Sequence, residues 1–258
     1  MKPLRELDAR AVSAILFDLD DTLTTAGRLT AEAYAALESL AAAGKRAVAV
    51  TGRPAGWCDH IARMWPVDAV VGENGAFFFR FAGGRMQRRY RDGPEVRSRN
   101  RARFDDIGRK ILAAVPGCAI AADQPYRETD LAIDYCEDVP ALPVEAAERI
   151  AAMMRAAGMH AKVSSIHVNG WFGDYDKLAM TRELFGDVFS IGADRLQREV
   201  VYVGDSPNDA PMFAFFAKSV GVANVRRFEP LLEAPPKYIA TREAGAGFTE
   251  VVAHLLRA

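Results

Sequence analysis

Residues 11–22 read AVSAILFDLDDT, an apolar run that ends abruptly in three acids. The first seven of these residues are almost entirely apolar and predict a buried β-strand. Asp18 and Asp20 follow the strand at alternate positions, and alternation in an extended segment puts both side chains on the same side. The sequence therefore predicts two carboxylates facing one pocket at the carboxyl end of a buried strand.

Strands and helices alternate beyond this stretch. Thr30 is a suitable N-cap for an Ala- and Leu-rich helix that stops at Gly44, and the apolar run AVAV at 47–50 follows at once. A third short strand, DAVVG, ends at Gly72. Such units with short connections demand a parallel sheet covered on both faces. The predicted fold class is therefore α/β, with a Rossmann-like parallel-sheet core and helices on both faces.

The rhythm changes between about Phe77 and Val168. An apolar FFFRF segment, a Gly83-Gly84 hairpin signal and two helical patterns separated by short strands predict an inserted α+β domain. After Lys177 the first rhythm resumes, so the core is built from both ends of the chain. We expect the core to comprise residues 1–82 and 170–258, and the inserted cap domain residues 83–169.

Composition narrows the classes of partner. Half of the 258 residues are apolar, and 33 basic residues nearly balance 34 acidic ones, which argues against a nucleic-acid or membrane-surface partner. The N-terminal stretch shows neither a signal peptide nor a membrane span. Three cysteines at unrelated spacings are typical of a reducing compartment. We expect a cytoplasmic protein; the sequence leaves its oligomeric state open.

Polar side chains converge where the predicted strands end. Thr51 ends the second strand, and Asp205 ends a later one, with Asp209 one helical turn further on. In open α/β sheets this edge is where ligands bind. Clustered carboxylates need a cation, and all-oxygen ligands select Mg²⁺. Lys177, at a helix N-terminus capped by Asp176, adds the positive charge that a phosphate group favours.

Four segments in this order resemble the four motifs of the haloacid dehalogenase superfamily: DLDDT at 18–22, TGR at 51–53, Lys177, and GDSPND at 204–209. The insertion between the second and third segments resembles the type IIB cap of the Cof-like and sugar-phosphatase-like members. GENGA at 72–76 is similar to the cap entrance of that subgroup. The resemblance covers the whole predicted core.

The resemblance implies a role for each matching residue. Asp18 would attack phosphorus and form an aspartyl-phosphate, and Asp20 would act as acid and then as base. Thr51 and Lys177 would hold phosphoryl oxygens. Mg²⁺ would be bound by Asp18, by the backbone carbonyl of Asp20 and by Asp205, with Asp209 acting through water or by orienting Lys177.

Five further residues are predicted to bind substrate: Gly52, Arg53, Asn74, Asn208 and His167. All of these except Gly52 also have a structural interpretation. Asn74 and Asn208 are common turn and cap residues, and Arg53 could simply fasten its loop by a salt bridge. His167 alternates with Ser165 and Asn169 on one polar strand face, which could line the substrate cavity, but a lone histidine in a strand is more often structural.

Arginines gather between Arg80 and Lys110, where ten of them and one lysine face only four acids. This excess is typical of a solvated surface, although a few of these side chains could attract an anionic substrate through bidentate contacts.

The resemblance implies hydrolysis of a small phosphorylated metabolite, with a sugar phosphate as the expected substrate. A phosphomutase of the phosphomannomutase type is the alternative enzyme, because that group has an Asp-Lys pair like Asp176-Lys177. A non-catalytic module that binds phosphate esters is a third possibility, which the presence of every motif acid disfavours.

Overall fold

Side chains of β2 (Ala14–Phe17) alternate between two apolar layers. Ile15 and Phe17 face one layer, and Ala14 and Leu16 face the other. Both faces must therefore be covered, as strands of parallel sheets require. The helices that cover the first layer are α1 (Ala31–Ala42), α2 (Ala55–Met64) and α8 (Ala244–Leu256), and those that cover the second are α5 (Lys177–Asp187), α6 (Ala193–Glu199) and α7 (Ala210–Phe215).

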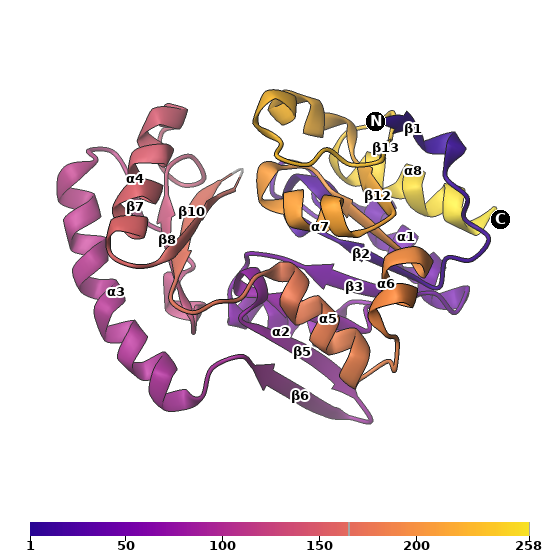
Figure 1. Cartoon of the computed structure of the whole chain (residues 1–258), viewed down its shortest axis with the longest axis horizontal. Helices are drawn as coiled ribbons and strands as arrows, with labels where there is room; N and C mark the ends of the chain where they lie inside the picture. The colour runs from indigo at the N-terminus through magenta and orange to yellow at the C-terminus, as the bar shows by residue number, and fades with distance from the viewer. Residues whose placement is uncertain (165, 258) are drawn as a thin grey trace.

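The central sheet has nine strands, and its seven consecutive strands from β1 to β4 are parallel. The last two strands run antiparallel to their neighbours. The spatial order is β1 (Lys2–Pro3), β13 (Tyr238–Ile239), β12 (Lys218–Gly221), β11 (Val200–Gly204), β2, β3 (Arg46–Val50), β4 (Ala69–Gly72), β5 (Phe77–Ala82) and β6 (Arg85–Tyr90). The predicted parallel core with helices on both faces is confirmed (Figure 1).

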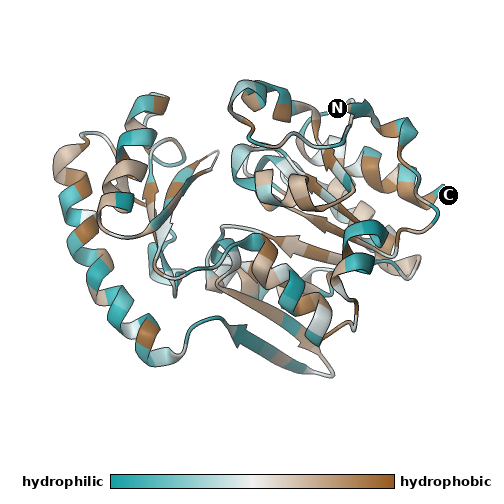
Figure 2. Cartoon of the chain, in the orientation of Figure 1, coloured by the Kyte–Doolittle hydropathy of each residue, from teal (hydrophilic) through white to brown (hydrophobic). Residues whose placement is uncertain are grey.

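The inserted segment forms a second layered unit beside the core (Figure 1). Its four-stranded sheet packs against two helices around a separate apolar cluster. The sheet order is β7 (Ala119–Ile120), β8 (Asp130–Asp134), β10 (His167–Trp171) and β9 (His160–Val163), and the helices are α3 (Pro94–Ala114) and α4 (Val144–Ala156). Figure 2 shows that α3 is hydrophilic along most of its length, with scattered apolar residues.

Short helical turns connect several of these elements. They are η1 (Leu4–Glu6), η2 (Leu19–Leu23), η3 (Glu73–Gly75), η4 (Gln124–Tyr126), η5 (Pro207–Asp209) and η6 (Ala223–Leu231). The computed structural model describes residues 1–164 and 166–257, so the predicted polar-face residue Ser165 lies outside the described residues. None of the described helices is long and apolar enough to cross a membrane.

The predicted caps hold. The Thr30 hydroxyl accepts a hydrogen bond from the Ala33 amide at 3.2 Å, and Gly44 takes a left-handed conformation with φ of 67°. Pro54 is the N-cap residue of α2. Cys58 is buried, whereas Cys118 and Cys136 are partly buried.

The domain boundaries at residues 82/83 and 169/170 stay a prediction. The pairing of β6 and of β10 suggests other positions for both. The Gly83-Gly84 turn joins β5 to β6, and β6 extends the central sheet by pairing with β5. Phe77 and Phe79 of β5 pack into the apolar cluster of the core. At the other junction β10 pairs with β8 along its full length through Trp171. We propose that the cap domain begins after Tyr90 and ends after Trp171.

Candidate active site

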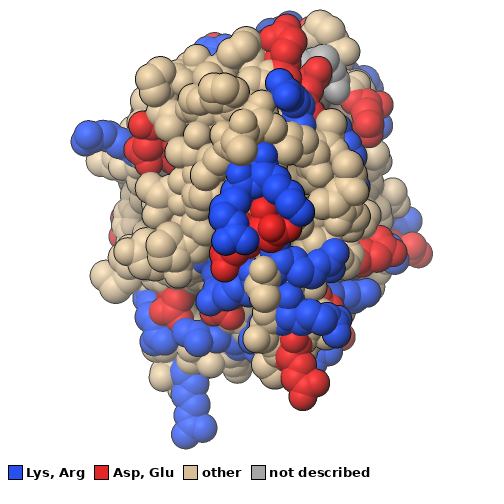
Figure 3. Space-filling model, turned by 90° about the vertical axis from the view of Figure 1, so that its left-hand side faces the viewer, with Lys and Arg blue, Asp and Glu red and all other residues tan. Residues whose placement is uncertain are grey.

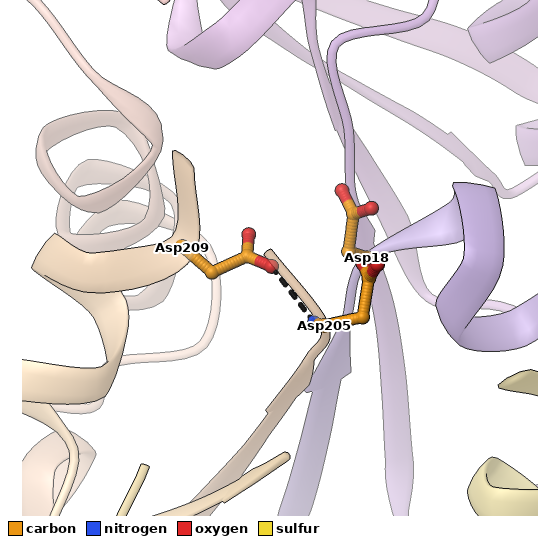
Figure 4. Close-up of side chains that lie close together, drawn as sticks. All are labelled: Asp18, Asp205 and Asp209. Carbon is orange, nitrogen blue, oxygen red and sulfur yellow. Dashed lines mark hydrogen bonds between the residues drawn. The ribbon is translucent and has the colours of Figure 1, made fainter. Parts of the chain in front are cut away.

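Three aspartates meet at the carboxyl edge of the central sheet. Asp18 follows β2 and Asp205 follows the adjacent β11, whose Val203 is in register with Phe17. Asp209 reaches the same point from η5, and one carboxylate oxygen of each aspartate lies within 4.8 Å of the others. All three residues are buried. Figure 4 shows their side chains and the elements that carry them. The predicted convergence of Asp18, Asp205 and Asp209 is therefore present.

Lys177 joins two of these carboxylates. Its Nζ donates to Asp18 Oδ1 at 2.7 Å and to Asp209 Oδ1 at 2.9 Å. The Asp176 carboxylate caps α5 by accepting from the Ala179 amide at 2.7 Å, which fixes Lys177 in the first turn. Gly75 makes this approach possible, because a Cβ there would lie 2.0 Å from the Asp176 carbonyl oxygen.

Asp209 is held from every side. Its Oδ1 also accepts from the Tyr202 hydroxyl at 2.5 Å, and its Oδ2 accepts from the Asp205 amide at 3.1 Å (Figure 4). Gly204 leaves room for it, since a Cβ there would lie 2.4 Å from Asp209 Oδ2. Both Asp209 oxygens are thus engaged by protein donors, an arrangement that orients Lys177.

Asp205 is held by neutral donors instead. Its Oδ1 accepts from the Thr22 hydroxyl at 3.0 Å, and its Oδ2 accepts from Asn224 Nδ2 at 3.2 Å. The same Asn224 nitrogen donates to the Asp21 carbonyl at 2.9 Å, which ties the turn after β2 to η6. Each Asp205 oxygen keeps a further lone pair for a cation.

The electrostatics of this cluster favour a cation. Burial raises the pKa of Asp18 to about 7, although the charge of Lys177 pulls it down. Burial, followed by repulsion from Asp209 and Asp18, also raises the pKa of Asp205. Burial works to lower the pKa of Lys177, but the two carboxylates outweigh it and raise that pKa. One lysine does not neutralise three carboxylates, and an all-oxygen donor set fits Mg²⁺.

The Asp20 carboxylate forms an ion pair with Arg53. It accepts from Arg53 Nε at 3.0 Å and from Arg53 Nη2 at 2.9 Å, so it stands apart from the three-aspartate cluster. The same guanidinium donates to Glu137 Oε1 at 2.7 Å. Arg53 is buried and stacks over the Trp57 ring, with its carbon Cζ 4.3 Å from the ring centre. A core arginine thus bridges the predicted acid-base residue and the cap.

His167 completes this bridge. Its Nε2 lies 2.8 Å from Glu137 Oε2, within ion-pair distance but off the direction of a hydrogen bond. Contact with His167 and then with Arg53 lowers the pKa of Glu137 to about 2, against the opposing effect of burial. His167 therefore lowers the pKa of Glu137, and its ring also lines the cavity that contains Asp18.

Three loops at the carboxyl edge of the sheet carry the predicted phosphate-binding residues. Thr51 is buried, and its hydroxyl accepts from the Arg53 amide at 3.0 Å, which leaves its proton free to donate. Asn74 is buried in a left-handed conformation, with φ of 57°, and its Nδ2 has no hydrogen-bond partner among the described residues. Asn208 accepts from the Ser206 hydroxyl at 2.7 Å. A Cβ on Gly52 would lie 3.2 Å from Asn74 Oδ1.

A small cavity of about 20 Å³ lies between this edge and the cap sheet. Asp18, Asp20 and Gly52 line its floor, and His167 and Asn169 line its roof. The cavity thus brings together residues that the motifs predicted and the polar strand face that alternation predicted. Asn208 lines both this cavity and a larger cleft, which Asn74 and Lys177 also line. Lys177 contacts Asp18 on the cavity floor, and Thr51 accepts from the amide of Arg53, another lining residue.

Most of the arginine-rich segment lies away from the three-aspartate cluster. Figure 3 shows basic side chains gathered on the lower half of the cap-side face, with acidic ones among them. Arg88 pairs with Asp59 at 2.7 Å, and Arg97 lies over the Tyr90 ring. Together with Arg101, they line a separate cavity of about 510 Å³ that neither Asp18 nor Lys177 reaches. Most of this excess serves the cap surface and its junction with the core.

Several site residues carried no sequence signal. Tyr202 lies inside an apolar strand, Asn224 in η6 far along the chain, and Glu137 in the cap. Glu73, which is fully buried, accepts from the Ala55, Glu128 and Thr129 amides and so joins core to cap. The GENGA segment predicted a role for Asn74 of this loop but none for Glu73.

Solved structures match the chain over nearly its full length. A protein of Thermoplasma acidophilum has a TM-score of 0.72 at 16% identity, covering 96% of this chain and 99% of its own. The sucrose-phosphatase of Synechocystis, solved with sucrose and phosphate, has a TM-score of 0.63 at 15% identity, covering 95% and 98%. A sugar phosphatase of haloacid dehalogenase subclass IIB has a TM-score of 0.62 at 15% identity, covering 96% and 100%.

At these identities the structural matches show the fold alone. Comparison with curated proteins finds no match. The family model for haloacid dehalogenase-like hydrolases matches residues 12–216, which include all four motifs and the cap. The chain belongs to the haloacid dehalogenase-like hydrolase family.

Proposed function

We propose that the protein is a magnesium-dependent phosphatase that transfers the phosphoryl group of a small phosphomonoester to Asp18 and then to water. The observation that carries this proposal is the state of the Asp18 carboxylate. Lys177 holds its Oδ1 at 2.7 Å, while its Oδ2 receives no hydrogen bond from the described residues. Asp18 is thus fixed in place with an oxygen available for attack on phosphorus.

The phosphoryl group would lie among fixed donors. Lys177, which contacts Asp18, would hold this group together with the Thr51 hydroxyl and the Asn74 amide, since donors placed in advance stabilise charge that develops on transferring oxygens. The unpaired Asn74 Nδ2 supports this role, because a buried amide without a partner is costly unless a ligand completes it.

Asp18, Asp205 and the backbone carbonyl of Asp20 would hold Mg²⁺. Asp209, whose oxygens are engaged by Lys177, Tyr202 and backbone amides, would act as a positioning residue. When bound, the ion offsets the repulsion between a carboxylate and a phosphate dianion. The residues supply the all-oxygen set that such an ion prefers.

Asp20 would act as acid and then as base. Its carboxylate, which Arg53 contacts at 2.9 Å, would take a proton from water in the second step. Protonating the leaving group in the first step requires that Arg53 release Asp20. A phosphate dianion in the cavity would compete for that guanidinium, so the predicted substrate role of Arg53 is consistent with the proposed sequence of steps.

A sugar phosphate is the substrate class that the neighbours suggest, since two of them are named as a sucrose-phosphatase and a sugar phosphatase. The His167 and Asn169 side chains above Asp18 offer the polar groups that hydroxyls require. We also propose a cytoplasmic location, in keeping with three free cysteines.

Phosphate release tests this proposal. A panel of sugar phosphates, polyol phosphates and an aryl phosphate is incubated with Mg²⁺ and, separately, with a chelator. We expect release that needs the metal and is abolished in Asp18→Asn, whose fold is checked by circular dichroism. Normal release by the folded Asp18→Asn variant would sink the mechanism. Isomerised product in place of phosphate, appearing only with a sugar bisphosphate activator, would identify a mutase.

A further inference from the structure

A cleft of about 670 Å³ opens beside the phosphate site, between the cap and α5. It is more than large enough for the leaving group of a sugar phosphate, whereas the cavity directly above Asp18 holds about 20 Å³. Its core wall includes Asn74, Lys177 and Asn208, and its cap wall includes Arg155, His160 and Lys162. A substrate whose phosphoryl group meets Lys177 can therefore extend along the cap wall.

Strand alternation directs the cap wall toward the core. Ala161 and Val163 of β9 pack into the apolar cluster of the cap, so His160 and Lys162 face the other way. Lys162 is in register with Asn169 of β10, which lines the cavity above Asp18. The Lys162 side chain thus stands beside the roof of the catalytic cavity.

Two positively charged side chains at the cleft have no acidic partner among the described residues. Neither Arg155 nor Lys162 makes an ion pair or a side-chain hydrogen bond with any residue the structure describes, and both are exposed. Arg91, also at the cleft, is committed to Glu183 at 3.3 Å. Asp176 caps α5, which leaves Asp174 as the opposing carboxylate on the described wall. The surplus distinguishes this cleft from the cavity at α3, where arginines pair with acids.

We propose that the leaving group of the substrate carries a second acidic group, and that Arg155 and Lys162 bind it. This inference rests on the proposed phosphatase function and narrows its substrate class from sugar phosphates in general to phosphomonoesters with a second anion. Between Arg155 and Lys162 in the sequence, exposed His160 lines the same cleft and is stacked against the buried Trp171 ring, with ring centres 6.0 Å apart.

Matched substrates test the inference. 6-Phosphogluconate and sorbitol 6-phosphate share one carbon skeleton and differ only in a carboxylate against a hydroxymethyl group. Glucose 1,6-bisphosphate and glucose 6-phosphate form the corresponding pair for phosphate. We expect the doubly acidic member of at least one pair to have a kcat/KM about tenfold higher, with a preference that shrinks at high salt. The pair that shows it identifies the second anion.

The variant that removes both charges while keeping the alkyl stems is Arg155→Met with Lys162→Met, which should lose most of that preference. Arg149→Ala is the matched control, because Arg149 is an exposed arginine of the same helix outside the cleft, and it should keep the preference. Calorimetric binding of the same four compounds to Asp18→Asn measures recognition without turnover, so its result does not depend on the chemistry.

The outcomes separate the two claims. Turnover with no preference in either pair, or a preference that the double methionine variant retains, overturns the inference and leaves the phosphatase proposal standing. No phosphate release from any compound counts against the phosphatase proposal. In that case tighter binding of the doubly acidic compounds, lost in the methionine variant, still supports the anion site, and equal binding rejects it.

Discussion

Asp18 is held by a hydrogen bond to one of its two carboxylate oxygens, which leaves the other oxygen available. Lys177 engages one oxygen, and the neighbouring Asp205 and Asp209 are each held by other donors. Asn74 presents the complementary feature, a buried amide nitrogen that has no partner in the described part of the chain. At the scale of single residues, the site consists of groups held in place by the protein and a few left open toward a ligand.

Asn74→Gly tests the open amide. Glycine keeps the left-handed backbone, with φ of 57° at Asn74, and no hydrogen bond of Nδ2 is lost. We expect kcat/KM for a good substrate to fall about tenfold, because a donor to the phosphoryl group is removed. Thermal denaturation should show only a small change in stability. Unchanged kinetics would remove Asn74 from the phosphate site.

Asp18, Thr51 and Asp205 could be predicted because each follows a strand that an apolar run defines, and Lys177 because it follows a helix-capping aspartate. Alternation also placed His167 and Asn169 on the face that lines the cavity. Asn224 and Glu137 could not be predicted, because their contacts with Asp21 and Arg53 join segments distant in the sequence. Tyr202 contacts the nearby Asp209, but it lies in an apolar strand. A tyrosine in an apolar strand is typical core, and nothing local tells which carboxylate its hydroxyl will reach.

Between elements, the decisive contacts cross from core to cap. Arg53 bonds to Asp20 below and Glu137 above, and Arg127 donates to the Gly52 carbonyl at 2.9 Å. The sequence predicted the β5–β6 hairpin from its glycines but assigned β6 to the cap, whereas hydrogen bonding puts it on the edge of the central sheet. Turn chemistry identifies a hairpin, but not the sheet that it joins.

The Glu137 contact should make stability depend on pH. Its pKa in the folded protein is about 2, below the ordinary 4.5, so its carboxylate stabilises the fold above pH 4.5 and this contribution fades as pH falls toward 2. We expect Glu137→Gln to lower the free energy of unfolding by about 1 kcal/mol above pH 5. The deficit should shrink between pH 4.5 and 3.

Urea denaturation of both proteins across this pH range measures the effect. Glu148→Gln is the matched control, since Glu148 is an exposed cap glutamate with no partner among the described residues. A deficit that stays constant down to pH 3 would show that the Glu137 charge does not contribute.

At the scale of the whole molecule, the cap sits closed over the core. A cavity of about 20 Å³ above Asp18 has room for about one water molecule and not for a sugar phosphate. Substrate binding therefore requires that the cap lift or that the Arg53 bridge rearrange. Closure over a bound substrate would exclude water until Asp20 is ready to activate one.

The buried acids also predict that Mg²⁺ stabilises the fold. Burial and mutual repulsion raise the pKa values of Asp18 and Asp205, so a bound cation relieves an unfavourable cluster. We expect the free energy of unfolding to rise by about 2.7 kcal/mol at a Mg²⁺ concentration about 100 times the Kd. Thermal denaturation with and without the ion measures it, and no activity is needed.

Asp205→Asn should lose most of this gain. Asp187→Asn, which alters an exposed acid at the end of α5, should keep it. An equal gain in the two variants would move the metal site away from the three-aspartate cluster.

Covalent labelling tests the central claim most directly. The protein is mixed with an aryl phosphate labelled with ³²P, whose good leaving group needs no acid, and the reaction is quenched in acid. We predict labelled protein, more of it in Asp20→Asn because hydrolysis then lacks its base, and none in Asp18→Asn. Phosphate release without any labelled protein, or label that persists in Asp18→Asn, would contradict phosphoryl transfer through Asp18.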